Sequence, residues 1–448
     1  MNQPTDRDTG VPVGSPGSIS DHPTGDSRVE PSRDEQRAAL VRLMLILAAG
    51  AFVAIYTGTF RTVAVVLSLI IMIVLHEAGH MVTAKWSHMK VTEFFVGFGP
   101  RLWSIRRGET EYGVKALWLG GYVKIIGMNN LEQVDPADEP RTYRQKSYPR
   151  RLSVAVAGST VHFLLAFVLF FITFAAVGAP FWPAEVGGVV PEVAGQPSPA
   201  AQAGLQKGDR IVSIDGRVFG DWRDVPPYVA NRPGEELKFV VERGGDRLEL
   251  TVVPVLADRV EVRGRVIESG ERGFVGIEEP TVRFRRVNPI VAIGRSADGV
   301  VTYAWGTLQA MGHIFSPSGI SAYFSGLTGS TADGGGGEES DVRFLSPVGF
   351  ARIASQAARA GIFEVLQLLV LINVFVGIFN MIPLLPLDGG HVAIATYEAI
   401  RSRISGKRHV VDVARLLPAT YLVLLIIVFI GATSLYLDVV DPLANPFE

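Results

Sequence analysis

The sequence contains no cysteine, and its 448 residues carry a formal net charge of only −2. Without thiols the chain can form no disulfide bond, and any metal it holds must be bound by histidine and carboxylate side chains. A charge this balanced predicts no basic surface of the kind that binds nucleic acid. The sequence also lacks the internal repeat that marks the two halves of many membrane transporters.

Hydrophobic residues, by contrast, make up 48% of the chain and give a mean hydropathy of +0.28. Several apolar runs are long enough to cross a bilayer as helices. They predict a multi-pass α-helical membrane protein with four core spans and one additional N-terminal span, which Arg42 interrupts. The runs are 39–56, 62–85, 152–177, 365–385 and 414–437.

The second run contains the sequence HEAGH at residues 76–80. His76 and His80 are four residues apart, so they share one face of a helix and can bind one metal ion together. Glu77 would serve as the base of a hydrolytic site, an arrangement typical of zinc metallopeptidases. At membrane depth each ionisable group costs about 2.5–3.5 kcal/mol, and a metal would offset that cost. We therefore predict a catalytic Zn²⁺ site here.

Lysine and arginine indicate how the spans are oriented. The loop 87–150 contains ten of them, and Arg401, Arg403, Lys407 and Arg408 follow the fourth run, whereas none follows the fifth. Short cytoplasmic loops carry the positive excess in membrane proteins. We therefore predict that both basic loops are cytoplasmic, that the C-terminus is outside, and that HEAGH lies in the inner half of the membrane.

A catalytic zinc ion needs a third protein ligand. The fourth run ends in NMIPLLPLDGG at residues 380–390, where two prolines break the helix and Asp388 precedes two glycines. An Asp-Gly pair is also a routine turn sequence. The predicted direction of this span, however, places Asp388 on the same side of the membrane as HEAGH, so we predict Asp388 as the third ligand.

The loop 87–150 is unusually apolar for a cytoplasmic segment. Residues 94–100 are apolar and glycine-rich, and residues 110–126 combine aromatic and β-branched residues as strands do. We interpret the region as a re-entrant β-hairpin whose backbone is satisfied by protein or by a wet cavity at membrane depth. A small cytosolic β-ribbon is the alternative interpretation.

Residues 180–285 predict a soluble domain on the outside. The stretch 198–216, SPAAQAGLQKGDRIVSIDG, combines an alanine-rich turn, glycine turns and an alternating strand. It resembles the PDZ domains of bacterial proteases, α+β domains that bind peptide ends by strand addition. Within this domain we expect residues 186–193 to form the exposed edge strand.

Taken together, these features resemble the site-2 proteases, a family of intramembrane zinc metalloproteases. The resemblance rests on HExxH in one span, NxxPxxxLDGG in a later one and a PDZ domain between them, and it covers residues 62–437. Residues 97–100 and 119–124 look like that family's re-entrant β-region. The single PDZ domain and the GETEY sequence at 108–112 look most like actinobacterial members.

The resemblance implies specific roles for residues of this chain. It implies that His76, His80 and Asp388 bind Zn²⁺ and that Glu77 is the catalytic base. It further implies that Asn380 and Pro383 help to position the substrate.

The resemblance also implies a function and a location. The expected activity is cleavage of single-span membrane proteins, such as anti-sigma factors or remnant signal peptides, in regulated intramembrane proteolysis. The expected setting is the bacterial plasma membrane, with a peptide end bound by the PDZ domain. The alternatives are an ion-coupled membrane transporter, since intramembrane ionisable groups also mark ion pathways, and a catalytically inactive membrane PDZ scaffold.

Four positions depart from the family pattern. Trp118 stands where proline is common, and Ser159 and His162 stand where proline and asparagine are usual. Ser346 stands before Pro347, where glycine is often found. His162 could hydrogen-bond near the active site, but we expect a structural role for it. None of these departures affects a predicted metal ligand.

The predicted organisation follows from these runs and motifs. It comprises a disordered cytoplasmic tail (1–38), an additional span (39–57), the first catalytic half (62–179), the outer PDZ domain (180–285), a connector (286–360), the second catalytic half (361–438) and an outer tail (439–448). Within the connector we expect a partly amphipathic helix at residues 288–313 and a flexible glycine-rich loop at residues 334–341.

Overall fold

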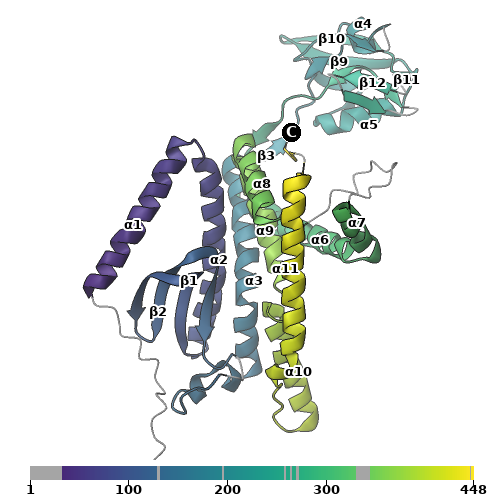
Figure 1. Cartoon of the computed structure of the whole chain (residues 1–448). Coiled ribbons are helices and arrows are strands. Elements are labelled where there is room, and N and C mark those ends of the chain that lie inside the picture. The colour runs from purple at the N-terminus through teal and green to yellow at the C-terminus, as the bar shows by residue number, and fades with distance from the viewer. Residues whose placement is uncertain are drawn as a thin grey trace, which may run out of the picture.

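The computed structural model describes residues 33–447 apart from 129–131, 194–195, 257–258, 263–264, 269–271, 329–343 and 444. Within these residues five helices are long and apolar enough to cross a membrane, which confirms the predicted multi-pass helical class (Figure 1). The five are α1 (Arg33–Tyr56), α2 (Phe60–Trp86), α3 (Tyr148–Ile172, continued by a π-helical turn at Thr173–Val177), α9 (Ile362–Phe379) and α11 (Leu417–Val440).

The first helix is longer than the sequence predicted. It begins at Arg33, inside the segment 1–38 that was expected to be disordered. Asp34 and Glu35 occupy its first turn, where carboxylates interact favourably with the positive end of the helix dipole. The polar residues 33–38 therefore extend the helix, and the rest of the predicted tail lies outside the described residues.

The spanning helices are organised around α3, which packs against both α2 and α9. Small residues permit this close packing. A Cβ atom on Gly79 of α2 would lie 3.1 Å from the carbonyl oxygen of Ala157, and one on Gly377 of α9 would lie 3.3 Å from Cβ of His162. In a membrane, small residues at helix contacts let backbones approach and gain van der Waals contact. Consequently α3 touches both helices that lead to the predicted site.

The two ends of the helix bundle differ. Helix α10 (Asp388–Ser405) and the N-terminal end of α3 lie at one end, whereas the small domain formed by residues 179–285 lies at the other (Figure 1). The chain passes from α10 through a 3₁₀ turn at Val413–Leu416 into α11, which returns to the small-domain end.

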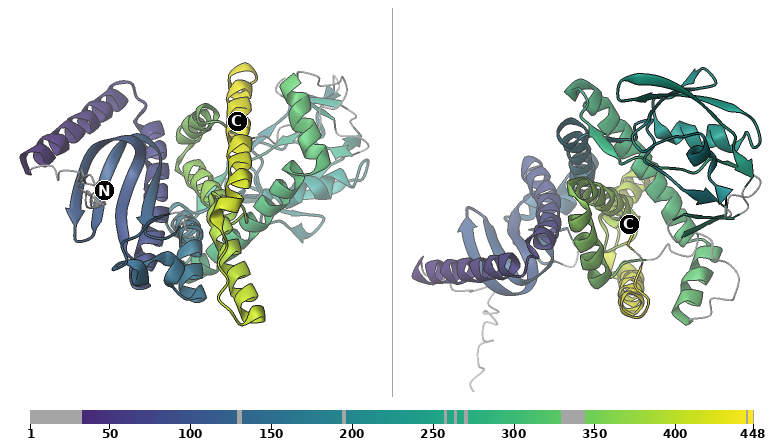
Figure 2. Two further views of the ribbon diagram at one scale, coloured as in Figure 1. Left: turned by 60° about the horizontal axis from the view of Figure 1, so that its bottom comes forward. Right: turned by 90° about the horizontal axis from the view of Figure 1, so that it is seen from above.

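The β-region is a sheet built from two long, bent strands, β1 (Val91–Arg107) and β2 (Thr110–Ile125). Residues 93–96 of β1 pair with residues 111–114 of β2 on one side and with residues 121–124 on the other. The predicted hairpin is thus folded back on itself. The sheet contacts α1 through β1 and α2 through both strands (Figures 1 and 2).

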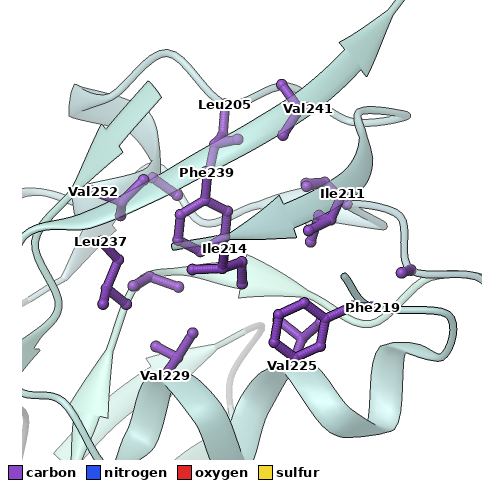
Figure 3. Packing of buried hydrophobic residues seen from close by; sticks show 14 of the residues in the cluster. Leu205, Ile211, Ile214, Phe219, Val225, Val229, Leu237, Phe239, Val241 and Val252 are labelled. Carbon is purple, nitrogen blue, oxygen red and sulfur yellow. The ribbon is translucent and has the colours of Figure 1, made fainter. Parts of the chain in front are cut away.

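The inserted small domain lies between β3 (Ala179–Phe181) and β16 (Arg283–Arg285), which pair with each other and so close its base. Its core contains Phe239 and Ile214 of the sheet and Val225 of a covering helix (Figure 3). The main sheet has the order β10-β9-β7-β8. Its strands and helices are β7 (Arg210–Ile214), β8 (Arg217–Val218), β9 (Leu237–Arg243), β10 (Asp246–Val252), α4 (Pro199–Gln202) and α5 (Val225–Ala230), with the short strands β4 (Gly188–Val189), β5 (Glu192–Val193), β6 (Gln196–Pro197), β11 (Val255–Leu256), β12 (Arg259–Val262), β13 (Arg265–Glu268), β14 (Gly273–Phe274) and β15 (Ile277–Glu278).

The prediction that residues 186–193 form an exposed edge strand is wrong. The backbone N–H of Val186 donates to the carbonyl of Asp209 at 2.8 Å, and that of the next residue, Gly187, donates to the carbonyl of Glu278 at 3.0 Å. Successive residues of an extended segment bond in opposite directions, so these contacts lie on its two sides. The start of the segment is therefore held between two others, and its second neighbour comes from about 90 residues further along the chain.

The connector 286–360 is mainly helical in its described part. It contains α6 (Pro289–Ile314), which coincides with the predicted amphipathic helix, followed by α7 (Pro317–Thr328) and α8 (Pro347–Ala360). Helix α6 packs against α3 and α9. The predicted glycine-rich loop at 334–341 lies outside the described residues.

Candidate metal centre

Helix α2 presents His76 and His80 together on its face towards α3, and both are buried. Their Nε2 atoms are 3.2 Å apart. Nδ1 of His80 lies 2.7 Å from the carbonyl oxygen of Val154 in α3. Because a carbonyl can only accept, Nδ1 carries the proton and Nε2 is left free to bind a metal, which is the usual arrangement of a metal-ligating histidine.

Asp388 is brought to the same place by a sharp turn between α9 and α10. The fourth span is shorter than the predicted 365–385, because α9 ends at Phe379 and the proline-containing segment 380–387 leaves the helix. The backbone N–H of Gly389 donates to the carbonyl of Asn380 at 2.7 Å. This bond folds the turn back onto the first residue of α10, which is Asp388.

The turn requires glycine at position 389. A Cβ atom there would lie 2.3 Å from the carbonyl oxygens of both Met381 and Ile382, a distance no side chain can occupy. Glycine alone allows the backbone to pass so closely. The sequence LDGG therefore serves the geometry that points Asp388 at α2.

The three predicted ligand atoms face one another. Oδ2 of Asp388 lies 3.4 Å from Nε2 of His76 and 3.2 Å from Nε2 of His80. Tetrahedral coordination with bond lengths of about 2.0–2.1 Å separates neighbouring ligand atoms by about 3.3–3.4 Å. Oδ2 is buried and has no hydrogen bond of regular geometry among the described residues. The donor set, its spacing and this unsatisfied oxygen all fit a zinc ion.

Gly158 of α3 keeps space open beside the histidines. A Cβ atom on it would lie 2.3 Å from Cε1 of His76 and 2.5 Å from Nε2 of His80. The backbone of α3 therefore runs directly against the two imidazole rings. Nothing in the amino-acid pattern indicates this role beyond a glycine inside an apolar helix.

Glu77 points in a different direction from the two histidines. It interacts with the backbone of Val123 in β2, and a Cβ atom on the neighbouring Gly121 would come within 3.3 Å of its Cγ. The predicted base thus lies between the metal-binding group and the sheet. Chemically, a carboxylate so placed can accept a proton from a water molecule next to the three ligands.

His162 and Asn373 form a buried polar pair close to the metal centre. Nδ1 of His162 lies 2.9 Å from Oδ1 of Asn373, and the His162 ring centroid is 4.9 Å from that of His76. Sequence reasoning missed Asn373. Its only signal was that a polar amide at the middle of an apolar span is costly and usually has a purpose.

A cavity of about 300 Å³ lies beside the turn at Leu385 and Pro386. Arg151 of α3 and Glu398 of α10 line it and form a buried ion pair, with Nη1 and Oε2 2.6 Å apart. The pair ties the start of α3 to the helix that begins at Asp388. Pro383 lies in the same turn and is exposed to a neighbouring cavity.

Comparison with known sequences agrees with this geometry. The sequence model of peptidase family M50 matches residues 64–425, a range that includes both halves of the metal centre. The chain belongs to family M50, the site-2 proteases. It is therefore a zinc metalloprotease, and the transporter and inactive-scaffold alternatives are not supported.

Several proteins named as zinc metalloproteases resemble the chain over most of their length. Zinc metalloprotease Rip1 of Mycolicibacterium smegmatis is 32% identical over 404 residues, which are 84% of this chain and 97% of Rip1. Rip1 of Mycobacterium tuberculosis is 32% identical over 406 residues, 84% and 96% of the two chains. A putative zinc metalloprotease of Rhizobium meliloti is 31% identical over 351 residues, 75% and 87% of the two chains.

Proposed function

We propose that this M50 protein is an intramembrane endopeptidase that cleaves single-span membrane proteins, with anti-sigma factors or remnant signal peptides as substrates. The observation that supports this most is the position of the metal-binding group. His76 and His80 lie within a helix that is apolar and long enough to span the membrane, and Asp388 reaches them from the turn after another such helix. Peptide bonds of a neighbouring membrane helix would be cleaved at the same depth.

In the proposed reaction His76, His80 and Asp388 hold zinc and Glu77 is the base. Zinc, when bound, polarises the scissile carbonyl and makes water at the site more acidic. Glu77 accepts the proton of the attacking water and passes it to the nitrogen of the leaving amine. Asn380 and Pro383 lie in the turn that carries Asp388, and they help to position the substrate.

The sheet supplies a means of presenting the substrate. The amides of a membrane helix are buried in their own hydrogen bonds, so a substrate must unwind before it can be cut. Residues 121–124 of β2 pair with β1 on one side, and Glu77 contacts this same part of β2. An unwound segment that adds to this edge as a strand would be held beside the base.

The remaining assignments concern the orientation of the molecule. The basic loops at 87–150 and 401–408 support a metal centre near the cytoplasmic side of a bacterial plasma membrane. The inserted domain, at the opposite end of the bundle, would then be extracytoplasmic. As a PDZ domain it would bind a peptide end or exclude substrates whose outer domains have not been removed.

The catalytic role of Glu77 can be tested with Glu77→Gln in the full-length, zinc-loaded protein in detergent micelles, using a single-span substrate. Loss of a general base typically reduces the rate by about 10²–10⁴-fold, so we expect at least about a 100-fold loss of cleavage with zinc content unchanged. Glu364→Gln is a matched control, because Glu364 lies in the first turn of α9, away from HEAGH in the sequence and in a different helix. Cleavage by Glu77→Gln at the wild-type rate would contradict the assignment.

A further inference from the structure

The two histidines of the metal centre differ in how their outer nitrogens are satisfied. Nδ1 of His80 bonds to the carbonyl of Val154, whereas Nδ1 of His76 is buried and has no hydrogen-bond partner within the described part of the chain. A metal bound at Nε2 of His76 requires the ring proton to be on Nδ1. That N–H needs an acceptor, because an unsatisfied buried donor costs about 1–3 kcal/mol.

The ring of His162 lies against that of His76. Their centroids are 4.9 Å apart, their planes are tilted by 44°, and only 2% of His162 is exposed. His162 comes from α3, one turn after Gly158, whose backbone touches both ligand rings. The two imidazole rings are therefore direct neighbours in the α2–α3 contact.

Asn373 decides which nitrogen of His162 can accept. Nδ2 of Asn373 donates to the carbonyl of Leu369 at 2.8 Å and approaches Sδ of Met72 at 3.3 Å, which leaves Oδ1 as the atom that faces His162. An amide oxygen only accepts, so Nδ1 of His162 must carry the proton. Nε2 of a neutral His162 is then a bare acceptor.

We propose that Nε2 of His162 accepts the Nδ1–H of His76 when zinc is bound, so that His162 is a positioning residue for the first metal ligand. Asn373 fixes the His162 tautomer from α9. The resulting chain of hydrogen bonds runs from the carbonyl of Leu369 through Asn373 and His162 to His76, and joins α9, α3 and α2 at the metal. The proposal rests on the proposed metal centre, and it replaces the purely structural role expected for His162 from the sequence.

The test compares zinc affinity among full-length variants in detergent micelles, measured by competition with a chelator of known affinity. Loss of such an outer hydrogen bond typically weakens metal binding by about 10–100-fold, which we expect for His162→Phe. His162→Gln retains a side-chain oxygen that can accept, and we expect it to recover most of the affinity. Phe163→Leu is the matched control, since Phe163 packs in the same α3–α9 contact but faces no ligand.

Wild-type zinc affinity in His162→Phe would overturn the proposal. Equal losses of zinc affinity in all three variants, His162→Phe, His162→Gln and Phe163→Leu, would also overturn it. Should His162→Phe fail to insert, Asn373→Leu gives a second measurement, because it removes the acceptor that fixes the tautomer. Unchanged zinc affinity in that variant would likewise overturn the proposal. Failure of the metal centre itself is distinguishable, because then the wild-type protein would bind no zinc or Asp388→Ala would bind it equally well.

Discussion

Residue 158 of α3 has space for a hydrogen atom and for nothing larger. Alanine normally stabilises a helix by about 1 kcal/mol relative to glycine. Here, however, the new methyl group would lie 2.5 Å from Nε2 of His80, where the metal must approach. We therefore expect Gly158→Ala to weaken zinc binding by at least about 10-fold by moving the rings apart.

Zinc affinity of the purified protein checks this prediction. Gly306→Ala in α6 is the control, because a Cβ atom on Gly306 would meet nothing within 4 Å. That variant should bind zinc normally. If Gly158→Ala also retained the wild-type affinity, the close approach of α3 to the imidazoles would not constrain the metal centre.

Individual residues of the site differed in how far the sequence could predict them. His76 and His80 were predictable because their spacing alone places them on one helical face. Asp388 required topology as well, since it is more than 300 residues away. Gly158 and Asn373 were not predictable, because their roles depend on which face of an almost uniformly apolar helix meets its neighbour.

At the scale of elements, the ion pair between Arg151 and Glu398 fixes α10 against α3. The side chains are only 13% and 6% exposed, and Glu398 also accepts the backbone N–H of Val411 at 2.7 Å. Glu398→Gln keeps the shape but leaves the Arg151 charge buried without its partner. Breaking a buried pair in this way costs about 3–5 kcal/mol.

We therefore expect Glu398→Gln to lower the thermal unfolding temperature in micelles and to weaken zinc binding, because α10 begins at Asp388. Glu109→Gln provides the comparison. Glu109 pairs with Arg141 at the surface, where both side chains are more than 40% exposed, and such pairs contribute about 0–1 kcal/mol. Equal effects of the two substitutions would show that α10 is not held by the buried pair.

The elements predicted best are those whose hydrophobic pattern continues over their whole length. The spans were found from their apolar length, and α6 from its amphipathic pattern. The fold-back of β1 and β2 was not, because a strand pattern does not say how many neighbours a strand has. The same limitation explains the incorrect edge at residues 186–193, whose second partner is remote in sequence.

For the whole molecule, the absence of cysteine provides a direct test of orientation. A single cysteine introduced at exposed Lys207 of the small domain or at exposed Ser405 at the end of α10 would be the only thiol in the chain. In intact cells a membrane-impermeant maleimide should label Lys207→Cys. It should label Ser405→Cys only after the membrane is permeabilised, because the two positions lie at opposite ends of the bundle. The reverse pattern would invert the proposed orientation.

The division of the metal centre between α2 and α10 also has a consequence in time. His76 and His80 are synthesised more than 300 residues before Asp388. At about 5–20 residues per second, a nascent chain spends about 15–60 s with two ligands in the membrane and no third. A protease assembled in this order cannot hold zinc with all three ligands until its own translation is almost complete.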